Sequence, residues 1–416
     1  MSVSPPDGRP CIEFDQHSRE YAEHNVEVLR TLRETAPVAW TSSYGGFWVV
    51  TRYEDVAAVL GDAETYSSAV VEESDGTRHG GTMIPTPPAF IQQIPAETDA
   101  PEWADYRRPL VARFSPAAVE GMRPAIDEIT SRTIDAIIGS GSCDLVYDIA
   151  NPIPSAAMFH ALGLPLDEWA PFAVHFHNAI AAAPGSEEFI AAGEGLTVFV
   201  EKLYAEVQER RSSPGSDIIS EIVGLTICGR PITDQESVSI VFTLTLAGVD
   251  TSTMLLSNAF AFLNDRPAQR AWLLEDRKNM RLATEEFLRW SSPGQALART
   301  VMRVAELGGQ RLEPGDRVLV YHASANRDES KFEKADECVL DRYPNRHVGF
   351  GVGPHRCLGS HLARAEFESV MSEVLRRMPD YEIDMSKASK YPNLGAVNGW
   401  VQLPATFTPE LSFVGS

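Results

Sequence analysis

The segment from Val238 to Leu263 is apolar on nearly every side of the helix that its sequence predicts. Such a helix either spans a membrane or forms the buried centre of a large domain. Its midpoint, Ala247-Gly248-Val249-Asp250-Thr251-Ser252-Thr253, contains a carboxylate and several hydroxyls, which argues against a membrane span. We therefore expect a protein folded around this segment. The helix that contains the segment begins at the capping box Thr233-Asp234-Gln235-Glu236.

The midpoint of this helix combines two residues that are unfavourable in a buried helix. Gly248 costs about 1 kcal/mol relative to alanine, and a buried carboxylate such as Asp250 costs more unless it is paired. A structural alternative is a helix kink, because the Thr251 hydroxyl can donate to a backbone carbonyl in the preceding turn. Two unfavourable residues side by side favour a functional role.

A glycine-rich loop near the C-terminus contains one cysteine, in Phe350-Gly351-Val352-Gly353-Pro354-His355-Arg356-Cys357-Leu358-Gly359. The following residues have helical periodicity, so Cys357 lies at a helix N-terminus, where free N–H groups favour a thiolate. A thiolate is a good ligand for a soft metal. A buried structural cysteine is the first alternative. A zinc site is the second, although zinc ligands rarely have this spacing; its further ligands would be His347, His355 and His361.

The complete loop resembles the haem-binding loop of the cytochrome P450 family, Phe-Gly-x-Gly-x-His/Arg-x-Cys-x-Gly, with every defining position filled. The resemblance runs from the N-terminal helices to the last strands. It implies one domain over residues 1–416, mainly α with a minor β region, with haem b (iron protoporphyrin IX) between the central helix and the cysteine-loop helix. Cys357 would be the axial thiolate ligand of the iron, and Phe350, Gly351 and Gly359 would contact the cofactor.

The resemblance also assigns residues to the haem propionates, which need cationic partners. The Trp103-x-x-x-Arg107 spacing matches the family's propionate-binding helix, although Trp103 replaces a histidine that is common in bacterial members. Arg299 matches a second propionate arginine, and His355 matches a third donor. Each residue alone could be an ordinary solvated side chain, but together they form a consistent set.

Two further motifs acquire roles from the resemblance. The family's central helix carries Ala/Gly-Gly-x-Asp/Glu-Thr, which implies that Gly248 makes room for dioxygen. Thr251 would donate a hydrogen bond during dioxygen activation, and Asp250 would relay protons from solvent. Glu286-Phe287-Leu288-Arg289 matches a Glu-x-x-Arg pair that binds an arginine before the cysteine loop, which we assign to Arg342. Alone, such a pair contributes only a few tenths of a kcal/mol.

The walls of the substrate pocket follow from the same resemblance and are mostly small or aliphatic, although each residue could equally belong to the ordinary core. They are Ile91, Ile94, Thr243, Leu246, Ala247, Gln295, Leu297, Ala396 and Val397. The loop from Ser67 to Pro95 lacks periodicity and is rich in Gly and Pro. We expect it to form a mobile lid together with residues 169–182 and the hinge Ala183-Pro184-Gly185.

These assignments predict a monooxygenase that hydroxylates a small or medium apolar molecule with O2. The electrons would come from a 2Fe-2S ferredoxin and its reductase. Two alternatives stay open. A haem-thiolate sensor or carrier would not need Asp250 and Thr251, and peroxide-using relatives usually replace this acid–alcohol pair.

Charge and cysteine content limit the partners and the location. The net charge of −22 disfavours nucleic acid. Five scattered cysteines indicate a reducing compartment, and the polar residues Met1 to Glu20 contain no signal or membrane anchor. We therefore expect a cytoplasmic protein. The ferredoxin would dock on arginines near the cysteine, which could equally be ordinary solvated residues: Arg108, Arg113, Arg346, Arg356 and Arg364.

The remaining patterns predict the order of the secondary structure. An N-terminal helix, two short strands and a second helix precede the irregular segment. Helices then dominate, and short strands return after Pro293. The expected ranges are 18–34 (helix), 38–40 and 47–51 (strands), 53–60 (helix), 67–101 (irregular) and 103–290 (helices).

Overall fold

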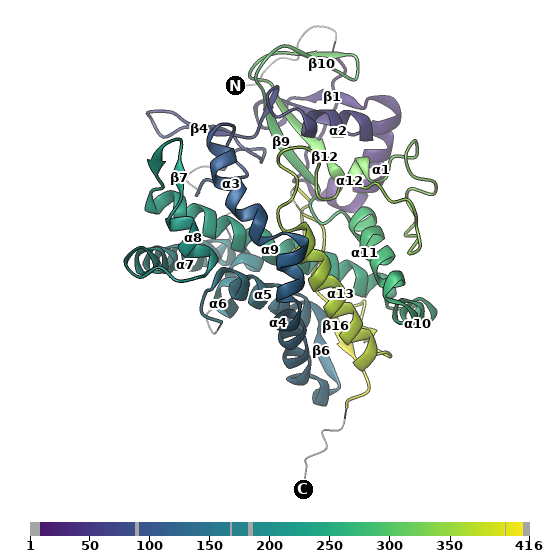
Figure 1. Cartoon of the computed structure of the whole chain (residues 1–416). Coiled ribbons are helices and arrows are strands. Elements are labelled where there is room, and N and C mark those ends of the chain that lie inside the picture. Colours follow the sequence, from purple (N-terminus) through teal and green to yellow (C-terminus); the bar gives the residue numbers. More distant parts are fainter. Residues whose placement is uncertain (1–8, 88–90, 167–168, 182–185, 396, 411–416) are drawn as a thin grey trace.

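The apolar segment forms α9 (Asp234–Leu263), a 30-residue helix that crosses the middle of the molecule (Figure 1). The capping box is present: the Thr233 hydroxyl accepts from the Glu236 N–H at 3.2 Å, and the Glu236 carboxylate accepts from the Thr233 N–H at 2.8 Å. The computed structural model describes residues 9–87, 91–166, 169–181, 186–395 and 397–410.

Helices make up most of the fold, as the sequence predicts. The other α-helices are α1 (Arg19–Thr35), α2 (Tyr53–Gly61), α3 (Glu102–Arg113), α4 (Pro116–Asp135), α5 (Pro152–Leu162), α6 (Trp169–Ala181), α7 (Glu187–Ser212), α8 (Ile218–Val223), α10 (Pro267–Glu275), α11 (Arg277–Ser291), α12 (His322–Ala325) and α13 (Ser360–Arg377). Shorter helical turns are η1 (Ser43–Gly45), η2 (Ile138–Ser140) and η3 (Leu145–Ala150).

The strands are short and form small sheets. They are β1 (Val38–Thr41), β2 (Phe47–Val50), β3 (Tyr66–Ser67), β4 (Val70–Glu72), β5 (Arg78–Gly80), β6 (Ser142–Asp144), β7 (Thr226–Ile227), β8 (Arg230–Pro231), β9 (Ala296–Val301), β10 (Ala305–Leu307), β11 (Gln310–Leu312), β12 (Arg317–Tyr321), β13 (Glu382–Ile383), β14 (Ser389–Lys390), β15 (Trp400–Gln402) and β16 (Pro404–Thr406).

The largest sheet lies at one end of the molecule, near α1, α2 and α12 (Figure 1). Its strand order is β1-β2-β12-β9-β3, in which β12 runs parallel to β2 and antiparallel to β9. Trp48 at the centre of β2 is fully buried. The sheet is therefore packed on both faces, and β9 runs from it toward the C-terminal loop, where Gly294 bridges to Val397.

Helix α9 contributes to two separate apolar cores. Its first half packs into one core through Phe242 and Val249, which lie among apolar residues of α5, α6, α7 and α8. Its second half packs into another core through Leu256 and Phe260, which lie among residues of η3, α11 and α13. By length and composition α9 could cross a membrane, but 78% of its most apolar window is buried within the described residues. It is the central helix of a folded domain.

The segment expected to be irregular contains one regular element. Strands β4 and β5 pair antiparallel as a short hairpin, with Val70 opposite Gly80. Gly76 in its turn and Gly80 both have positive φ, which glycine adopts readily. The glycines that hide the periodicity in the sequence therefore build the turn. Residues 88–90, residue 182 and the proposed hinge at residues 183–185 lie outside the described residues.

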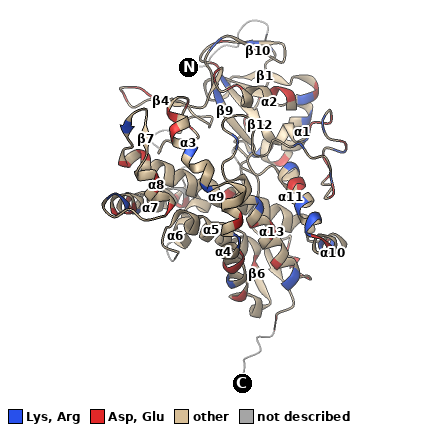
Figure 2. Cartoon of the chain, in the orientation of Figure 1, with Lys and Arg blue, Asp and Glu red and all other residues tan. Residues whose placement is uncertain are grey.

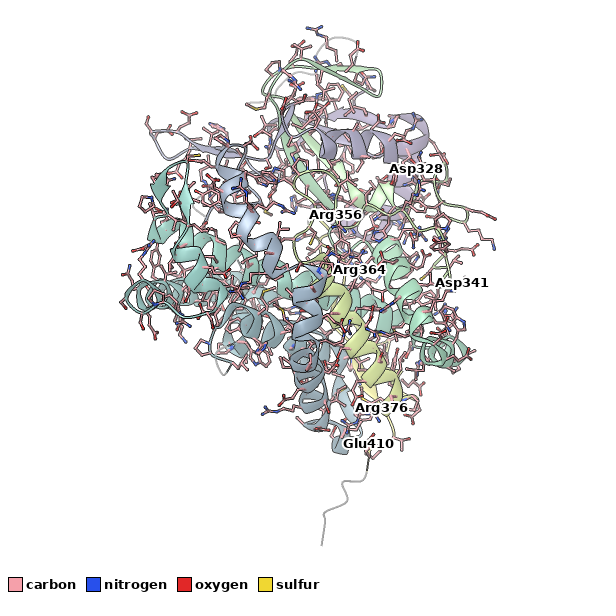
Figure 3. All side chains as sticks on the ribbon, viewed as in Figure 1. Asp328, Asp341, Arg356, Arg364, Arg376 and Glu410 are labelled. Atoms are coloured by element: carbon pink, nitrogen blue, oxygen red, sulfur yellow. The ribbon has the colours of Figure 1, made fainter. Side chains whose placement is uncertain are left out.

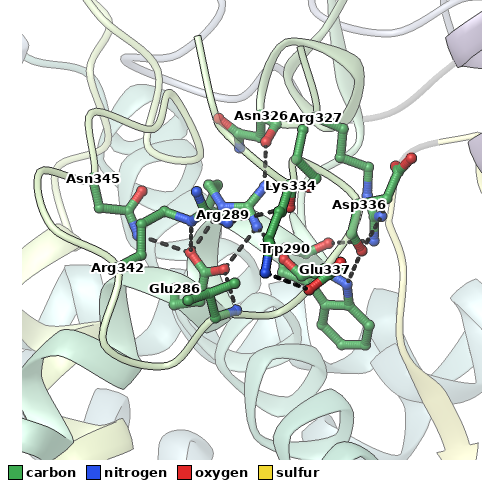
Figure 4. Close-up of polar contacts among 12 residues, drawn as sticks. Glu286, Arg289, Trp290, Asn326, Arg327, Lys334, Asp336, Glu337, Arg342 and Asn345 are labelled. Carbon is green, nitrogen blue, oxygen red and sulfur yellow. Dashed lines mark hydrogen bonds and ion pairs between the residues drawn. The ribbon is translucent and has the colours of Figure 1, made fainter. Parts of the chain in front are cut away.

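A buried ion-pair network fixes the chain that precedes the cysteine loop (Figure 4). Glu286 and Arg289, one turn apart on α11, form two hydrogen bonds of 2.8 and 2.7 Å, and both side chains have no exposed surface. Arg342 donates to the same carboxylate at 3.0 Å. Arg289 also donates to the backbone carbonyls of Asn326, Ala335 and Glu337 at 2.6–2.7 Å. The network therefore ties α11 to residues 326–345.

Glu286→Gln should destabilise the protein by roughly 3–5 kcal/mol, because it leaves the buried Arg289 guanidinium without its counter-charge. A matched control is Glu337→Gln, since Lys334 and Glu337 are also three residues apart but more than 60% exposed. Such an exposed pair contributes at most about 1 kcal/mol. Urea denaturation followed by tryptophan fluorescence measures both losses. Equal losses in the two variants would contradict the prediction.

Candidate active site

The cysteine loop folds tightly against the start of α13. The N–H of Cys357 donates to the Phe350 carbonyl at 2.8 Å, which closes the loop on itself. Gly351 and Gly353 have positive φ. A Cβ on Gly353 would lie 2.5 Å from the carbonyl oxygen of Leu60, so the close contact with the end of α2 requires glycine there.

Cys357 lies three residues before α13, whose N-cap is Gly359. The backbone N–H of Gly359 and the cations of Arg107, Arg356 and Arg364 each lower the pKa of the thiol, as a helix N-terminus predicts. Cys357 keeps accessible surface, yet it lies deep in the fold, and this burial outweighs the other effects and raises its pKa overall. A bound metal ion would remove the thiol proton regardless.

Two arginines and a histidine gather beside the cysteine loop. Arg299 on β9 is 2% exposed, and burial lowers its pKa to about 10, with Asp99 as the opposing charge. His355 has a pKa lowered to about 4 by burial and by the cations of Arg299 and Arg107. A further buried arginine, Arg317 of β12, was not predicted from the sequence. Its pKa is lowered to about 10 by burial and by the positive charge of Arg299.

The indole of Trp103 completes this group of donors. Its ring lies 5.4 Å from the His355 ring and 5.8 Å from the Arg107 guanidinium. Its buried Nε1–H has no acceptor in the described part of the chain. Cations so close together, with an unpartnered donor among them, favour an anion at this place. The residues present therefore fit a group that carries carboxylates, such as haem with its two propionates.

The polar centre of α9 lies where its two apolar cores meet. The Thr251 hydroxyl donates to the carbonyl of Ala247, one turn before, at 2.9 Å. Asp250 is 2% exposed, and neither of its carboxylate oxygens has a hydrogen-bond partner among the described residues. A Cβ on Gly248 would lie 2.1 Å from the methyl group of Met158, so this glycine permits close packing of α9 on α5. Its role toward dioxygen stays a prediction.

A second buried acid reaches α9 from the opposite helix and was not predicted. Glu366 of α13 accepts a hydrogen bond from the Ser252 hydroxyl at 2.7 Å. It is 1% exposed, and burial raises its pKa to about 8. No local pattern could have indicated this pair, because its members are separated by 114 residues in the sequence.

The structure separates the expected pocket residues into three groups. Ile91, Ile94 and Leu246 share one apolar core. Ala247 and Leu297 are exposed. Val397 forms a β-bridge with Gly294, just before β9. Thr243 is buried and donates to the Ser239 carbonyl, and the Gln295 amide donates to the Ser292 carbonyl at 2.6 Å. The Gln295 side chain is therefore held within its own loop. Ala396 lies outside the described residues.

The histidines of the zinc alternative do not converge on the cysteine. His347 bonds to Glu285 at 3.0 Å through Nε2, and His355 lies against Ser68 and Trp103. Within the described ranges, no three His, Cys, Asp or Glu residues form a group that could hold a metal ion. Cys357 is therefore left as a single protein ligand, which matches haem iron better than zinc.

Comparison with known proteins gives a consistent result. The sequence profile of the family described as Cytochrome P450 matches residues 186–393. Cytochrome P450 130 of Mycobacterium tuberculosis is 31% identical over 385 residues, which cover 90% of this chain and 93% of that protein. Mycinamicin IV hydroxylase/epoxidase of Micromonospora griseorubida is 30% identical, with 90% and 94% covered. A Mycobacterium marinum cytochrome P450 in complex with pseudoionone is structurally similar, with a TM-score of 0.87, 29% identity and 97% of this chain covered.

Proposed function

Because the chain belongs to the cytochrome P450 family, with haem as cofactor and monooxygenase activity, we propose that it hydroxylates a small or medium apolar molecule. The observation that carries the proposal is the acid–alcohol pair at the midpoint of α9 together with a single cysteine in the loop before α13. Related proteins are named for different molecules, among them a Steroid C26-monooxygenase. Apolar side chains such as Ile91, Ile94 and Leu246 favour an apolar substrate.

The residues around the cofactor would each hold one part of it. Cys357 would bind the iron as a thiolate, and Arg107, Arg299, His355 and Trp103 would bind the propionates through charge-assisted hydrogen bonds. When bound, haem with a thiolate ligand supplies the one-electron chemistry that activates dioxygen. We also propose that residues 1–416 act as one domain, and a cytoplasmic location stays a prediction.

Thr251 and Asp250 would manage protons rather than bind substrate. The Thr251 hydroxyl donates a hydrogen bond to the Ala247 carbonyl and can rotate to donate one toward the cofactor side instead. Its oxygen can at the same time accept a hydrogen bond from a neighbouring proton donor. Asp250 is buried with no hydrogen bond within the described residues, so its carboxyl is free to give up and regain a proton. A sensor or carrier would not need this pair, which favours the enzyme.

Cys357→Ala should abolish the strongly red-shifted Soret band that thiolate-bound haem gives after reduction and addition of carbon monoxide. The variant removes the only sulfur that the loop offers to the iron. Cys143→Ala is the control, because burial raises the pKa of that thiol to about 12 and it lies on β6, away from the loop. A retained band in Cys357→Ala would disprove the assignment.

Thr251→Ala should leave the affinity for a spin-shifting ligand nearly unchanged while diverting reducing equivalents from product into hydrogen peroxide. The ratio of product to reductant consumed is expected to fall roughly tenfold or more, since positioned proton transfer contributes about 10²–10⁴-fold. Thr245→Ala is the control, because its hydroxyl makes the same bond one turn back, to Val241, deep in the apolar core. Unchanged coupling in Thr251→Ala would refute the proposed role.

We further propose that an acidic 2Fe-2S ferredoxin docks on the cysteine side, over a groove of about 470 Å³ between α11, α13 and residues 342–345. Four basic residues and two acidic ones line the groove, although the whole chain is acidic. Figure 2 shows basic residues on α10, α11 and α13, and Figure 3 shows Arg356 and Arg364 near the start of α13. The charged groove residues are Lys278, Arg281, Glu285, Arg342, Arg364 and Glu368.

The arginines named from the sequence are not equally suited to docking. Arg113 is held by Glu221 and Arg364 by Glu285, so their charges are already neutralised locally. Arg108, Arg346 and Arg356 are exposed, and no ion pair is recorded for them among the described residues. Of the arginines named from the sequence, Arg108, Arg346 and Arg356 are therefore better suited to docking than Arg113 and Arg364.

Arg281→Glu and Lys278→Glu should each slow electron transfer from an acidic ferredoxin roughly tenfold at low ionic strength, because opposite charges speed encounter. Added salt should reduce the difference from the unmodified protein, since the Debye length is about 8 Å at physiological ionic strength. Arg311→Glu, an equally exposed arginine on the β11 hairpin, is the control. A salt-independent rate, or equal slowing by all three variants, would exclude this surface.

A further inference from the structure

Among the described residues, the unpartnered carboxyl of Asp250 lies close to two titratable side chains, His177 on α6 and Tyr391. The His177 Nδ1 atom lies 3.8 Å from the Asp250 Oδ1 atom, and the two side chains are 1% and 2% exposed. Buried carboxylates in proteins are almost always bonded or paired. No Lys or Arg nitrogen of the described residues comes within 4.0 Å of Asp250. The imidazole is therefore the nearest group that can exchange a proton with this acid.

The contacts of the imidazole determine which of its nitrogens is free to take a proton. The His177 Nε2 atom lies 3.3 Å from the Val401 carbonyl oxygen. A carbonyl can only accept, so Nε2 carries a hydrogen. Nδ1 lies 2.8 Å from the Tyr391 hydroxyl oxygen and accepts its hydrogen when the ring is neutral. The basic nitrogen of the neutral ring is thus Nδ1, the atom that faces Asp250.

We propose that His177 supplies the proton that restores the acid form of Asp250 after each transfer, and that Tyr391 is the positioning residue for the imidazole ring. This inference rests on the proposed monooxygenase function. An imidazolium at His177 loses its Nδ1 proton to the Asp250 carboxylate, and the neutral ring then takes a proton from solvent. The 3.8 Å gap is longer than a hydrogen bond, so a side-chain rotation or one bridging water closes it.

The neighbours of His177 suit such an exchange. The ring of Tyr147 packs edge-on against it with centroids 5.3 Å apart, and Tyr147 is 40% exposed, so one side chain separates the imidazole from solvent. Burial, Asp250 and Tyr147 hold the pKa of Tyr391 well above its ordinary value, so its hydroxyl stays protonated as a donor. The nearby charges of the packed segments are Asp144, beside Tyr147, and Lys390, whose ammonium lies over the Trp400 ring.

The coupling between the two side chains can be measured without turnover. Histidine-labelled holoprotein in its reduced, carbon monoxide-bound form allows the His177 ring to be titrated by NMR. An opposite charge within 4–6 Å favours the charged form, so Asp250→Asn should move the protonation of His177 to lower pH. His175, on the same helix but packed against Gly195, should titrate unchanged. An unaltered His177 titration in Asp250→Asn would overturn the proposal.

The supply role is tested by turnover against pH. His177→Asn keeps an amide nitrogen near the position of Nδ1 but cannot carry the proton. Product formation should fall roughly tenfold, and the decline with rising pH that the proposal predicts for the unmodified enzyme should disappear. Tyr391→Phe should keep that decline but shift it. His175→Asn is the control and should behave as the unmodified enzyme.

The two possible failures can be told apart. Absence of product in the unmodified protein with every ligand that shifts its spin state would defeat the proposed function, whatever the NMR titration shows. Normal turnover with an unchanged pH profile in His177→Asn would defeat only the supply role of His177. The carbon monoxide spectrum confirms in each variant that the cofactor site is folded.

Discussion

The burial of most of α9 is the constraint on which the rest of the structure depends. Because no face of this helix can meet water without loss, the other helices must surround it, and they do so as two apolar cores that meet at its midpoint. The polar residues Asp250 to Thr253 lie at that junction. Close packing then fixes their positions, since neighbours such as Met158 fill the space over Gly248.

Buried charge is distributed unequally on the two sides of the site. Behind the cysteine loop, the Glu286 carboxylate accepts hydrogen bonds from both Arg289 and Arg342, so each buried guanidinium has a direct counter-charge. Beside the loop, Arg299 and Arg107 lie close to His355 with few anions among them, and burial together with these two positive charges lowers the pKa of the histidine. The first arrangement holds the backbone in place, and the second stabilises a bound anion.

The sequence predicted those features that depend on residues close together in the chain. The capping box of α9 and the extent of α1 and α2 follow from local spacing, and the structure confirms them; the fold was implied by the family resemblance of the Cys357 loop and is also confirmed. The contacts of Asp250 with His177 and of Ser252 with Glu366 could not be predicted, because the partners come from distant helices without a shared pattern. The hairpin β4–β5 was missed because its glycines hide the strand periodicity.

The two buried acids beside Thr251 differ in what they can do because their partners differ. Within the described residues, the Glu366 carboxyl accepts one hydrogen bond, from the Ser252 hydroxyl, and its raised pKa of about 8 keeps it largely protonated at neutral pH. The unfolded chain loses this proton first, so Glu366 lowers the stability as pH rises from about 4.5 to 8. Asp250 instead faces the His177 imidazole, whose Nδ1 atom lies 3.8 Å from its carboxylate. The proton-transfer role proposed for Asp250 requires a partner that can exchange a proton, whereas an acid that stays neutral does not, and the midpoint of α9 has Asp250 on the helix itself and Glu366 reaching it from α13.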